Sequence, residues 1–457
     1  MKKAFVLFAL CLVLVLGAVS IAFFHLHQDR NQVTVTAETL AGDPAQAAGL
    51  TAKQSAQYNG RLRWDLTIPL DRPQDTVSDF SPRQPPAEGI PMGPSIYMSV
   101  PGPGNSIYSL SGSYSLESVT KSNPELAPLL PLFQEIAQQT PDGQTHCETI
   151  TLRDYLDVYP LAVDITVPYP ACRNGNYSMG YLSKVWQDFF AFPIPADERW
   201  TIAIQKDNQG DIRELSLEKD SLYATYSPNL FTAYLGGRLF FTLEGNSSGA
   251  CVNTPGGFGL YSPALVWLDG DPYLELDVLS NVFPLPQGTV VLDLSASRDG
   301  QNLLLTTRLG DVCTLRVIDP ETMAVEQSLT IPDRDLTGSI VGEDFLLFWS
   351  DAQLHLYSLG NGIYTYAFSA PMEESLILGE DYLAAAWNGE KLALAAPADP
   401  TTYAPGLEAA VYAQGTLVYR GIYETSLTDN ARDDPDSPRP TGTVRMVNGA
   451  ELALAWT

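Results

Sequence analysis

A run of 21 residues near the N-terminus, Ala4–Phe24, contains no charged side chain. At 1.5 Å per residue, a helix of this length covers a hydrocarbon core of about 30 Å. Lys2 and Lys3 precede the run and no Lys or Arg follows until Arg30, which favours a cytoplasmic N-terminus. The sequence therefore predicts a single-pass membrane protein with most of the chain extracytoplasmic.

A cleaved secretory signal is the alternative, because Gly17-Ala18-Val19-Ser20 offers small residues for cleavage. Apolar residues 21–24 continue past that point, and the apolar region of a signal peptide usually runs only about 7–15 residues. We therefore favour an uncleaved anchor. Both alternatives export the remainder of the chain.

The exported part is strongly acidic. After Arg30 the chain carries 23 Lys and Arg residues against 52 Asp and Glu residues. Such a surface repels nucleic acid and anionic lipid headgroups. A Walker A phosphate loop is absent because no Gly-Lys dipeptide occurs. We expect no nucleic acid, nucleotide or cofactor to bind.

Four cysteines lie in the exported part: Cys147, Cys172, Cys251 and Cys313. They allow three pairings. A Cys147–Cys172 disulfide is favoured because these residues bracket two expected strands, and its loop of about 25 residues would contribute roughly 3 kcal/mol. Four reduced thiols are the alternative. No C-x-x-C pair occurs, and no metal site is predicted.

Short β-type runs between turn signals predict an all-β fold of antiparallel strands. Expected strands are Gln32–Leu40 and Arg61–Ile68, and the Asp43-Pro44 pair resembles a helix start. Nine prolines between Pro69 and Pro103 indicate an extended loop. Helical spacing is clearest over Asn123–Gln139.

Two hairpins are expected. In Trp200–Lys219 a Gly-containing turn separates two apolar runs, and in Gly442–Trp456 the Asn448-Gly449 pair provides the strongest short-range hairpin signal. The second half also shows a faint repeat, in which a polar turn leads into an apolar run. The anchor residues of the repeat are separated by 65, 41, 37 and 35 residues; they are Leu239, Leu304, Phe345, Tyr382 and Leu417.

Residues 297–303 (SRDGQNL) resemble the Ser-x-Asp-Gly-x-x-Leu turn of many β-propeller blades. This resemblance and the spacing of about 40 residues imply an array of four-stranded blades. A β-sandwich with evenly spaced hairpins is the alternative. A closed propeller commonly completes its last blade with an N-terminal strand, so Gln32–Leu40 or Arg61–Ile68 should pair with a strand after Ala410.

The expected organisation has five parts. They are a cytoplasmic tip (residues 1–3), a transmembrane helix (4–24), a stalk with one strand (25–57), a β-rich region (58–218) with a Pro-rich loop (69–103) and a short helix (123–139), and a β-propeller-like region (219–457).

Candidate ligand-binding residues lie in the stretch Arg153–Tyr169, where acids alternate with tyrosines: Asp154, Tyr155, Asp157 and Tyr159, followed by Asp164 and Tyr169. Paired carboxylates with aromatic platforms are typical of glycoside hydrolysis, and the same residues also suit a binding surface. A G-x-S-x-G match at 245–249 is followed by loop residues instead of a helix, so Ser247 is not expected to be a nucleophile. Trp186, Trp200, Trp267, Trp349 and Trp387 are expected in the core.

No arrangement commits the chain to a reaction, and no catalytic residue is assigned. The favoured function is a membrane-anchored extracytoplasmic module that binds a protein, peptide or envelope glycan. An exported hydrolase acting on sugars through paired carboxylates is the alternative.

Overall fold

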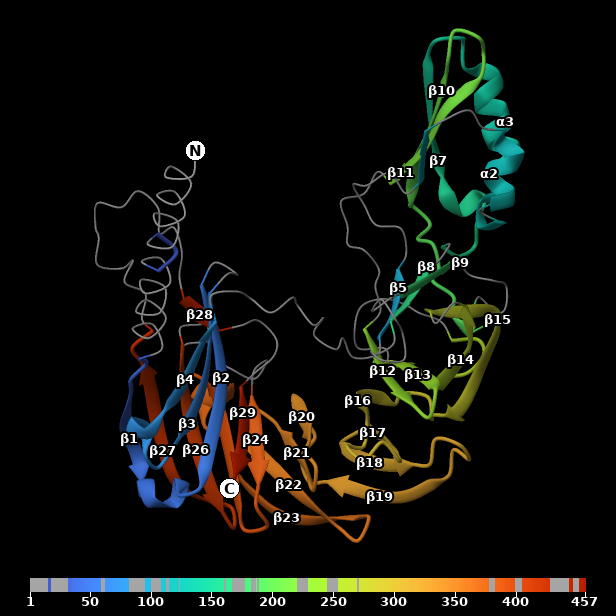
Figure 1. The fold of residues 1–457 in the computed structure, drawn as a ribbon. Coiled ribbons are helices and arrows are strands. Elements are labelled where there is room, and N and C mark those ends of the chain that lie inside the picture. Colours follow the sequence, from blue (N-terminus) through green and yellow to red (C-terminus); the bar gives the residue numbers. More distant parts are fainter. Residues whose placement is uncertain are drawn as a thin grey trace, which may run out of the picture. The chain divides into compact units, whose positions relative to one another are not determined.

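The computed structural model describes residues 15–17, 32–58, 62–81, 95–99, 108–111, 115–122, 124–159, 162–166, 177–181, 186, 189–219, 229–244, 254–268, 271–377, 383–398, 405–427, 444–446 and 452–457. The chain divides into unit 1, which comprises Met1–Ile90 and Asp335–Thr457, and unit 2, which comprises Pro91–Arg334. Antiparallel sheets dominate both units, so the all-β prediction is confirmed (Figure 1).

The predicted anchor falls almost entirely outside the described residues. Of Ala4–Phe24, only residues 15–17 are described. Among the residues whose structure is described, no helix is long and apolar enough to cross a membrane.

The described residues of unit 1 form three sheets. The first contains β20 (Gly338–Val341), β21 (Phe345–Trp349), β22 (Gln353–Gly360) and β23 (Ile363–Pro371). The second contains β24 (Ala384–Trp387), β25 (Lys391–Pro397), β26 (Gly406–Ala413), β27 (Thr416–Thr425) and β1 (Val35–Gly42). The third contains β2 (Leu50–Tyr58), β3 (Leu62–Pro69), β4 (Val77–Ser81), β28 (Val444–Met446) and β29 (Ala453–Trp456). Short helical turns join them: η1 (Pro44–Ala47), η2 (Pro73–Asp75) and α5 (Glu374–Ile377).

In unit 2, the residues with described positions form four sheets. One contains β12 (Leu230–Leu235), β13 (Arg238–Leu243), β14 (Gly259–Leu268) and β15 (Asp271–Pro284). The next contains β16 (Val290–Ala296), β17 (Leu303–Leu309), β18 (Val312–Ile318) and β19 (Val325–Ile331). A three-stranded sheet contains β5 (Ser95–Ser99), β8 (Ala162–Thr166) and β9 (Tyr177–Tyr181).

The fourth sheet of unit 2 is covered by helices (Figure 1). Its strands are β6 (Tyr108–Ser111), β11 (Ile212–Lys219), β10 (Arg199–Lys206) and β7 (Thr145–Thr151), with α2 (Leu116–Ser122), η3 (Pro124–Leu129) and α3 (Leu130–Gln139) on one face and η4 (Leu152–Asp154) after β7. The expected helix is confirmed by η3 and α3, and the expected Trp200–Lys219 hairpin is confirmed by β10 and β11.

Within each unit, successive sheets pack face to face. In unit 1, Leu347 and Leu356 from one sheet share a core with Leu392 and Leu394 from the next. In unit 2, residues of β12–β14 share a core with residues of β16–β18, among them Phe240, Leu260, Leu294 and Leu305. Face-to-face packing of antiparallel sheets whose strands follow sequence order is the arrangement of β-propeller blades.

The turn that resembles a propeller motif is built as its sequence suggests. It joins β16 to β17, and Gly300 has a φ of +69°, which glycine adopts at little cost. The Ser297 hydroxyl donates to Asp299 Oδ1 (2.6 Å) and accepts from the Asn302 N–H (2.9 Å). The bond from Ser297 lowers the pKa of Asp299, so this carboxylate stays charged and holds the turn.

The predicted pairing of an N-terminal strand with a strand after Ala410 is confirmed. Val35–Gly42 pairs antiparallel with β27, in register from Val35 opposite Thr425 to Gly42 opposite Tyr419. The other candidate, Arg61–Ile68, lies in β3 between β2 and β4. Residues 25–57, which were expected to form a stalk with one strand, thus include β1 and most of β2.

The predicted C-terminal hairpin is wrong. Both β28 and β29 pair antiparallel with β2, β28 along Ala56–Tyr58 and β29 along Leu50–Lys53. The two strands therefore follow one another along a single edge and do not pair with each other. Asn-Gly favours a hairpin locally, but the free edge of β2 offers each strand a ladder of backbone hydrogen bonds and a buried face.

The proline-rich range 69–103 contains two strands, β4 and β5, in addition to loop. Both lie at sheet edges. An edge strand needs backbone donors on one side only, so it tolerates nearby prolines.

The repeat anchors are only partly equivalent. Leu239, Leu304 and Phe345 lie in β13, β17 and β21, each the second strand of its sheet. Leu417 lies in β27, a fourth strand, and Tyr382 is outside the described residues, just before the first strand β24. A polar turn followed by an apolar run occurs at every hairpin, so the pattern cannot tell one strand of a blade from another.

The side chain of Gln54 is buried among apolar residues. Gln54 on β2 is 1% exposed, and neither its Nε2 nor its Oε1 has a hydrogen-bond partner in the described part of the chain. It lies opposite Leu66, with Ala52 and Ala56 on the same face of β2. An unpaired buried amide costs about 1–3 kcal/mol.

We expect Gln54→Met to raise the free energy of unfolding by about 1 kcal/mol, because methionine fills a similar volume without unpaired polar atoms. Thermal denaturation of the two proteins measures the difference. Gln54→Glu is the matched control and should destabilise, since it buries a charge in the same place. A less stable Gln54→Met protein would show that bound water already satisfies the amide.

Candidate functional site

The predicted acid and tyrosine residues differ in their exposure. Asp154 ends η4, and Asp154, Tyr155 and Asp157 are all exposed. Tyr159 is buried in the core of unit 2, and its N–H donates to the Phe192 carbonyl (2.9 Å). The structure thus separates a solvent-facing group of three residues from a structural tyrosine.

The disulfide prediction remains a prediction. Cys147 lies on β7 and is exposed, whereas Cys172 and Cys251 lie outside the described residues. Cys313 is buried on β18, where its thiol contacts the Arg334 carbonyl (3.5 Å).

Other sequence candidates give no site in the described ranges. Ser247 and its neighbours lie outside those ranges, and His355 is buried within β22. Across the residues with described positions, no group of three or more His, Cys, Asp or Glu side chains is placed to hold a metal ion.

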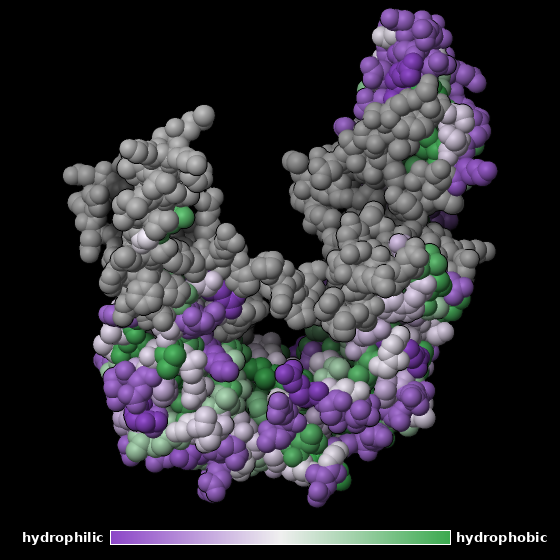
Figure 2. Space-filling model, in the orientation of Figure 1, coloured by the Kyte–Doolittle hydropathy of each residue, from purple (hydrophilic) through white to green (hydrophobic). Residues whose placement is uncertain are grey.

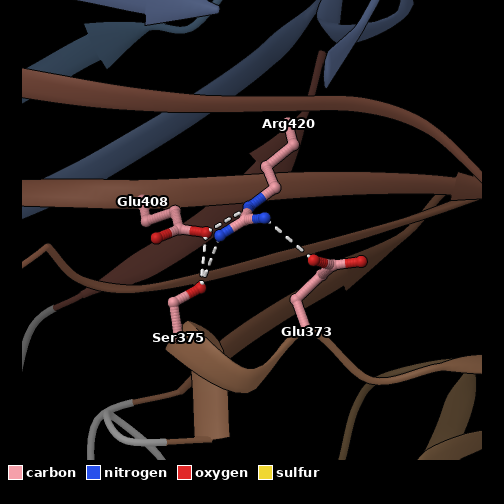
Figure 3. Close-up of polar contacts among 4 residues, drawn as sticks. All are labelled: Glu373, Ser375, Glu408 and Arg420. Carbon is pink, nitrogen blue, oxygen red and sulfur yellow. Dashed lines mark hydrogen bonds and ion pairs between the residues drawn. The ribbon is translucent and has the colours of Figure 1, made fainter. Parts of the chain in front are cut away.

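A polar cluster in unit 1 was not predicted from the sequence (Figure 3). Arg420 on β27 donates through Nε to Glu408 Oε1 (2.6 Å) and through Nη1 to Glu373 Oε2 (2.9 Å). Its Nη2 donates to the Ser375 hydroxyl (2.9 Å), which in turn donates to Glu408 Oε1 (2.7 Å). One guanidinium therefore joins two strands to the segment that carries α5.

Local structure explains how these residues meet. Arg420 lies opposite Ala410 and Glu408 opposite Ile422, so the two charged residues are diagonal neighbours on one face of the β26–β27 ladder. Glu373 immediately precedes α5 and Ser375 lies within it, in the connection from β23 to β24. The sequence signal that could have found the cluster is Glu408 itself, a lone charge in the otherwise apolar run GLEAAVYA.

The electrostatics of the cluster indicate a structural role. The Glu408 side chain is 6% exposed, whereas those of Arg420 and Glu373 are 25% exposed. Burial alone would lower the pKa of Arg420, but the hydrogen bond and charge of Glu408 raise it, helped by the charge of Glu373. Because both carboxylates are bound to the same guanidinium, these two acids are not a free acid and base for glycoside chemistry.

A second feature is the tip of the β14–β15 hairpin in unit 2. Phe241 of β13 pairs with Tyr261 of β14, and β13 begins at Arg238, so β14 extends past β13 from Leu265 onward. Residues Leu265–Leu268 and Asp271–Leu274 then pair only with each other in the described structure. We call this two-stranded extension the β14–β15 ribbon.

Both faces of the ribbon carry exposed apolar side chains. Val266 (40% exposed) lies opposite Tyr273 (41%) on one face, and Trp267 (40%) lies opposite Pro272 on the other. Leu268 near the tip is 56% exposed. In the space-filling view, hydrophobic surface appears over this part of the molecule beside hydrophilic residues (Figure 2).

The ribbon corrects the expectation for one tryptophan. Trp186, Trp200 and Trp349 are buried as predicted, and Trp387 packs against a core from a partly buried position. Trp267 was expected in the core and is exposed instead. The strand that carries Trp267 has the same apolar composition as a buried strand. Trp267 lies beyond the point where the neighbouring strand β13 begins, and the sequence of β14 gives no sign of this.

No family model matches the chain, and no curated protein is similar to it in sequence. Similar solved structures include the Cps50 (Swd1) β-propeller domain of Myceliophteria thermophila, with 14% identity over 49% of this chain and 82% of that one and a TM-score of 0.24. A candidate 6-phosphogluconolactonase from Bacteroides fragilis has 9% identity over 91% of this chain and 100% of that one, with a TM-score of 0.33. The Dos1 propeller has 7% identity over 58% of this chain and 75% of that one, with a TM-score of 0.26. These are weak likenesses of fold to β-propellers and indicate no specific family.

Proposed function

We propose that this chain is a membrane-anchored extracytoplasmic binding module with a propeller-like fold, and that it contacts a partner protein through the β14–β15 ribbon. The observation that carries this proposal is the exposure of Val266, Trp267, Leu268 and Tyr273 on a ribbon that extends beyond its sheet.

The ribbon is costly to leave in water. A two-stranded hairpin alone is at best marginally stable in water, and the other two strands of this sheet, β12 and β13, do not extend to the tip. Burial of a large apolar side chain contributes about 1.5–3 kcal/mol, so a partner that covers the tip stabilises both the hairpin and the complex. Tryptophan and tyrosine are the residue types that most often dominate protein interfaces.

A protein partner fits the ribbon better than a glycan. A sugar ring stacks against a single aromatic face, whereas Val266 and Trp267 project from opposite faces of the ribbon. Covering both faces requires a partner that wraps around the tip or receives it in a groove.

Site-specific photo-crosslinking in the producing cells tests the contact. A photoreactive phenylalanine at Tyr273 should give one discrete adduct with another protein, and Trp267→Ser should abolish it because the apolar contact is lost. The matched control is the same probe at Tyr366, an exposed tyrosine of β23 in unit 1. Equal adducts at both positions would contradict a specific contact at the ribbon.

The membrane location is a separate part of the proposal and rests on the hydropathy of Ala4–Phe24 and on Lys2 and Lys3. Cys147 is exposed and can report the topology. In a variant that keeps only this cysteine, a membrane-impermeant maleimide should label intact cells and remain with the membrane fraction. Labelling only after lysis would show that the bulk of the chain faces the cytoplasm.

A further inference from the structure

Resting on the proposed function, we infer that the segment received by the β14–β15 ribbon is basic: a stretch of the partner protein in which Lys or Arg residues alternate with or flank apolar residues. The inference comes from the charges that are interleaved with the exposed apolar side chains.

The strands of the ribbon carry acids and no bases. No Lys, Arg or His occurs between Arg238 and Arg298, an interval that includes β14, β15 and β16. Acids concentrate at the ribbon itself, where β15 begins Asp-Pro-Tyr-Leu-Glu-Leu-Asp. The single base in the strands of its sheet is Arg238 at the start of β13, and its guanidinium donates to the Pro320 carbonyl (2.8 Å). No base within the ribbon therefore offsets its negative charge.

One carboxylate lies where a partner must cover it. Glu275 is exposed and lies two residues after Tyr273, so both project from the same face of β15. A partner that buries Tyr273 therefore removes water from the Glu275 carboxylate.

Desolvation of a carboxylate without a counter-charge costs several kcal/mol and would offset the gain from apolar burial. A Lys or Arg of the partner placed against Glu275 compensates for this cost. Arg does so with additional geometric specificity, because its planar fork binds a carboxylate through two hydrogen bonds. Charge complementarity thus selects a basic segment over a neutral or acidic one.

The same argument disfavours a second copy of this chain as the occupant. Two ribbons in contact would bring their acidic residues together, and each chain carries a formal net charge of −27. Like charges across an interface cost several kcal/mol.

The experiment uses the full chain in an uncharged detergent and three labelled peptides. The peptides are four Lys-Val repeats, four Glu-Val repeats and four Lys-Ser repeats, and fluorescence anisotropy measures their affinity. We expect the Lys-Val peptide to bind at least about tenfold more tightly than either of the others, with an affinity that falls as salt rises.

Two variants locate the binding. Trp267→Ser removes an apolar anchor and Glu275→Lys reverses a charge, and each should weaken Lys-Val binding at least about tenfold. The matched controls are Leu309→Ser, an exposed leucine at the β17–β18 hairpin, and Glu326→Lys, an exposed acid of β19. Both controls should change the affinity less than about twofold.

The possible failures are distinguishable from one another. Equal affinity for the Lys-Val and Glu-Val peptides, or no effect of Glu275→Lys, would overturn the basic partner while the Tyr273 adduct could still support a contact at the ribbon. Binding that survives Trp267→Ser, or no binding of any peptide, would overturn the inference at this site. A dimer in analytical ultracentrifugation that Trp267→Ser dissociates would instead identify a second copy as the occupant.

Discussion

Replacing Arg420 with alanine should lower the free energy of unfolding of unit 1 by about 3–5 kcal/mol. The substitution leaves the Glu408 side chain, which is 6% exposed, without its counter-charge, and removes the donor that joins Glu373 and Ser375 to β27. Scanning calorimetry should show a large fall in the transition temperature of unit 1.

A matched control separates burial from charge. Arg72 is 63% exposed and forms ion pairs with Asp71 and Asp75, so Arg72→Ala should cost less than about 1 kcal/mol. If the two alanine variants were equally stable, the ion pairs of Arg420 would stabilise unit 1 no more than the exposed ion pairs of Arg72 do.

The loss at Arg420 should come from the buried carboxylate of Glu408 that the substitution leaves without a counter-charge. A double variant, Arg420→Met with Glu408→Met, should therefore recover much of the lost stability at neutral pH.

Gly42→Ala should destabilise unit 1 by about 2–4 kcal/mol and loosen its N-terminal strand. Gly42 ends β1 with a φ of +73°, where an L side chain costs roughly 1–2 kcal/mol. A Cβ there would also collide with the backbone carbonyl of Val418, which accepts the Asp43 N–H (3.1 Å). The neighbouring strand β27 must move, which weakens the β1–β27 ladder.

Gly310→Ala is the control that isolates the collision. Gly310 also has a positive φ (+62°), at the β17–β18 turn, but its added Cβ would meet no atom within 4 Å. Calorimetry should therefore show a smaller loss at Gly310, and limited proteolysis should release the N-terminal strand only from the Gly42→Ala protein. Equal losses at the two positions would show that backbone strain alone accounts for the effect.

The sequence predicted those features that depend on local chemistry. Turn residues located the Ser297 turn, and apolar spacing located α3 and the β10–β11 hairpin, because each is formed by neighbours along the chain. The general rule of ring closure also identified β1 as a partner for a late strand.

The predictions that failed concern features that depend on which segments, distant in sequence, pack against each other. The Asn448-Gly449 pair specifies a turn locally but gives no information about the free edge of β2, which β28 and β29 occupy. The exposure of Trp267 likewise depends on where β13 begins, and the four residues around Arg420 meet only after two strands and α5 have packed. Neither candidate site therefore has a motif in the sequence.

The strand pairing in unit 1 also sets the order of events during synthesis. The sheet that contains β1 is complete only after β27 has been made, and this edge of β2 is covered only after β28 and β29 have been made. Until then, the first strands to emerge present unpaired edges that can recruit other chains. Unit 1 must therefore reach its native state after β29 has been synthesised, and a chain that lacks both β28 and β29 leaves this edge of β2 unpaired. Loss of these two short strands would act on the fold of the whole unit and on its aggregation, far beyond the few residues removed.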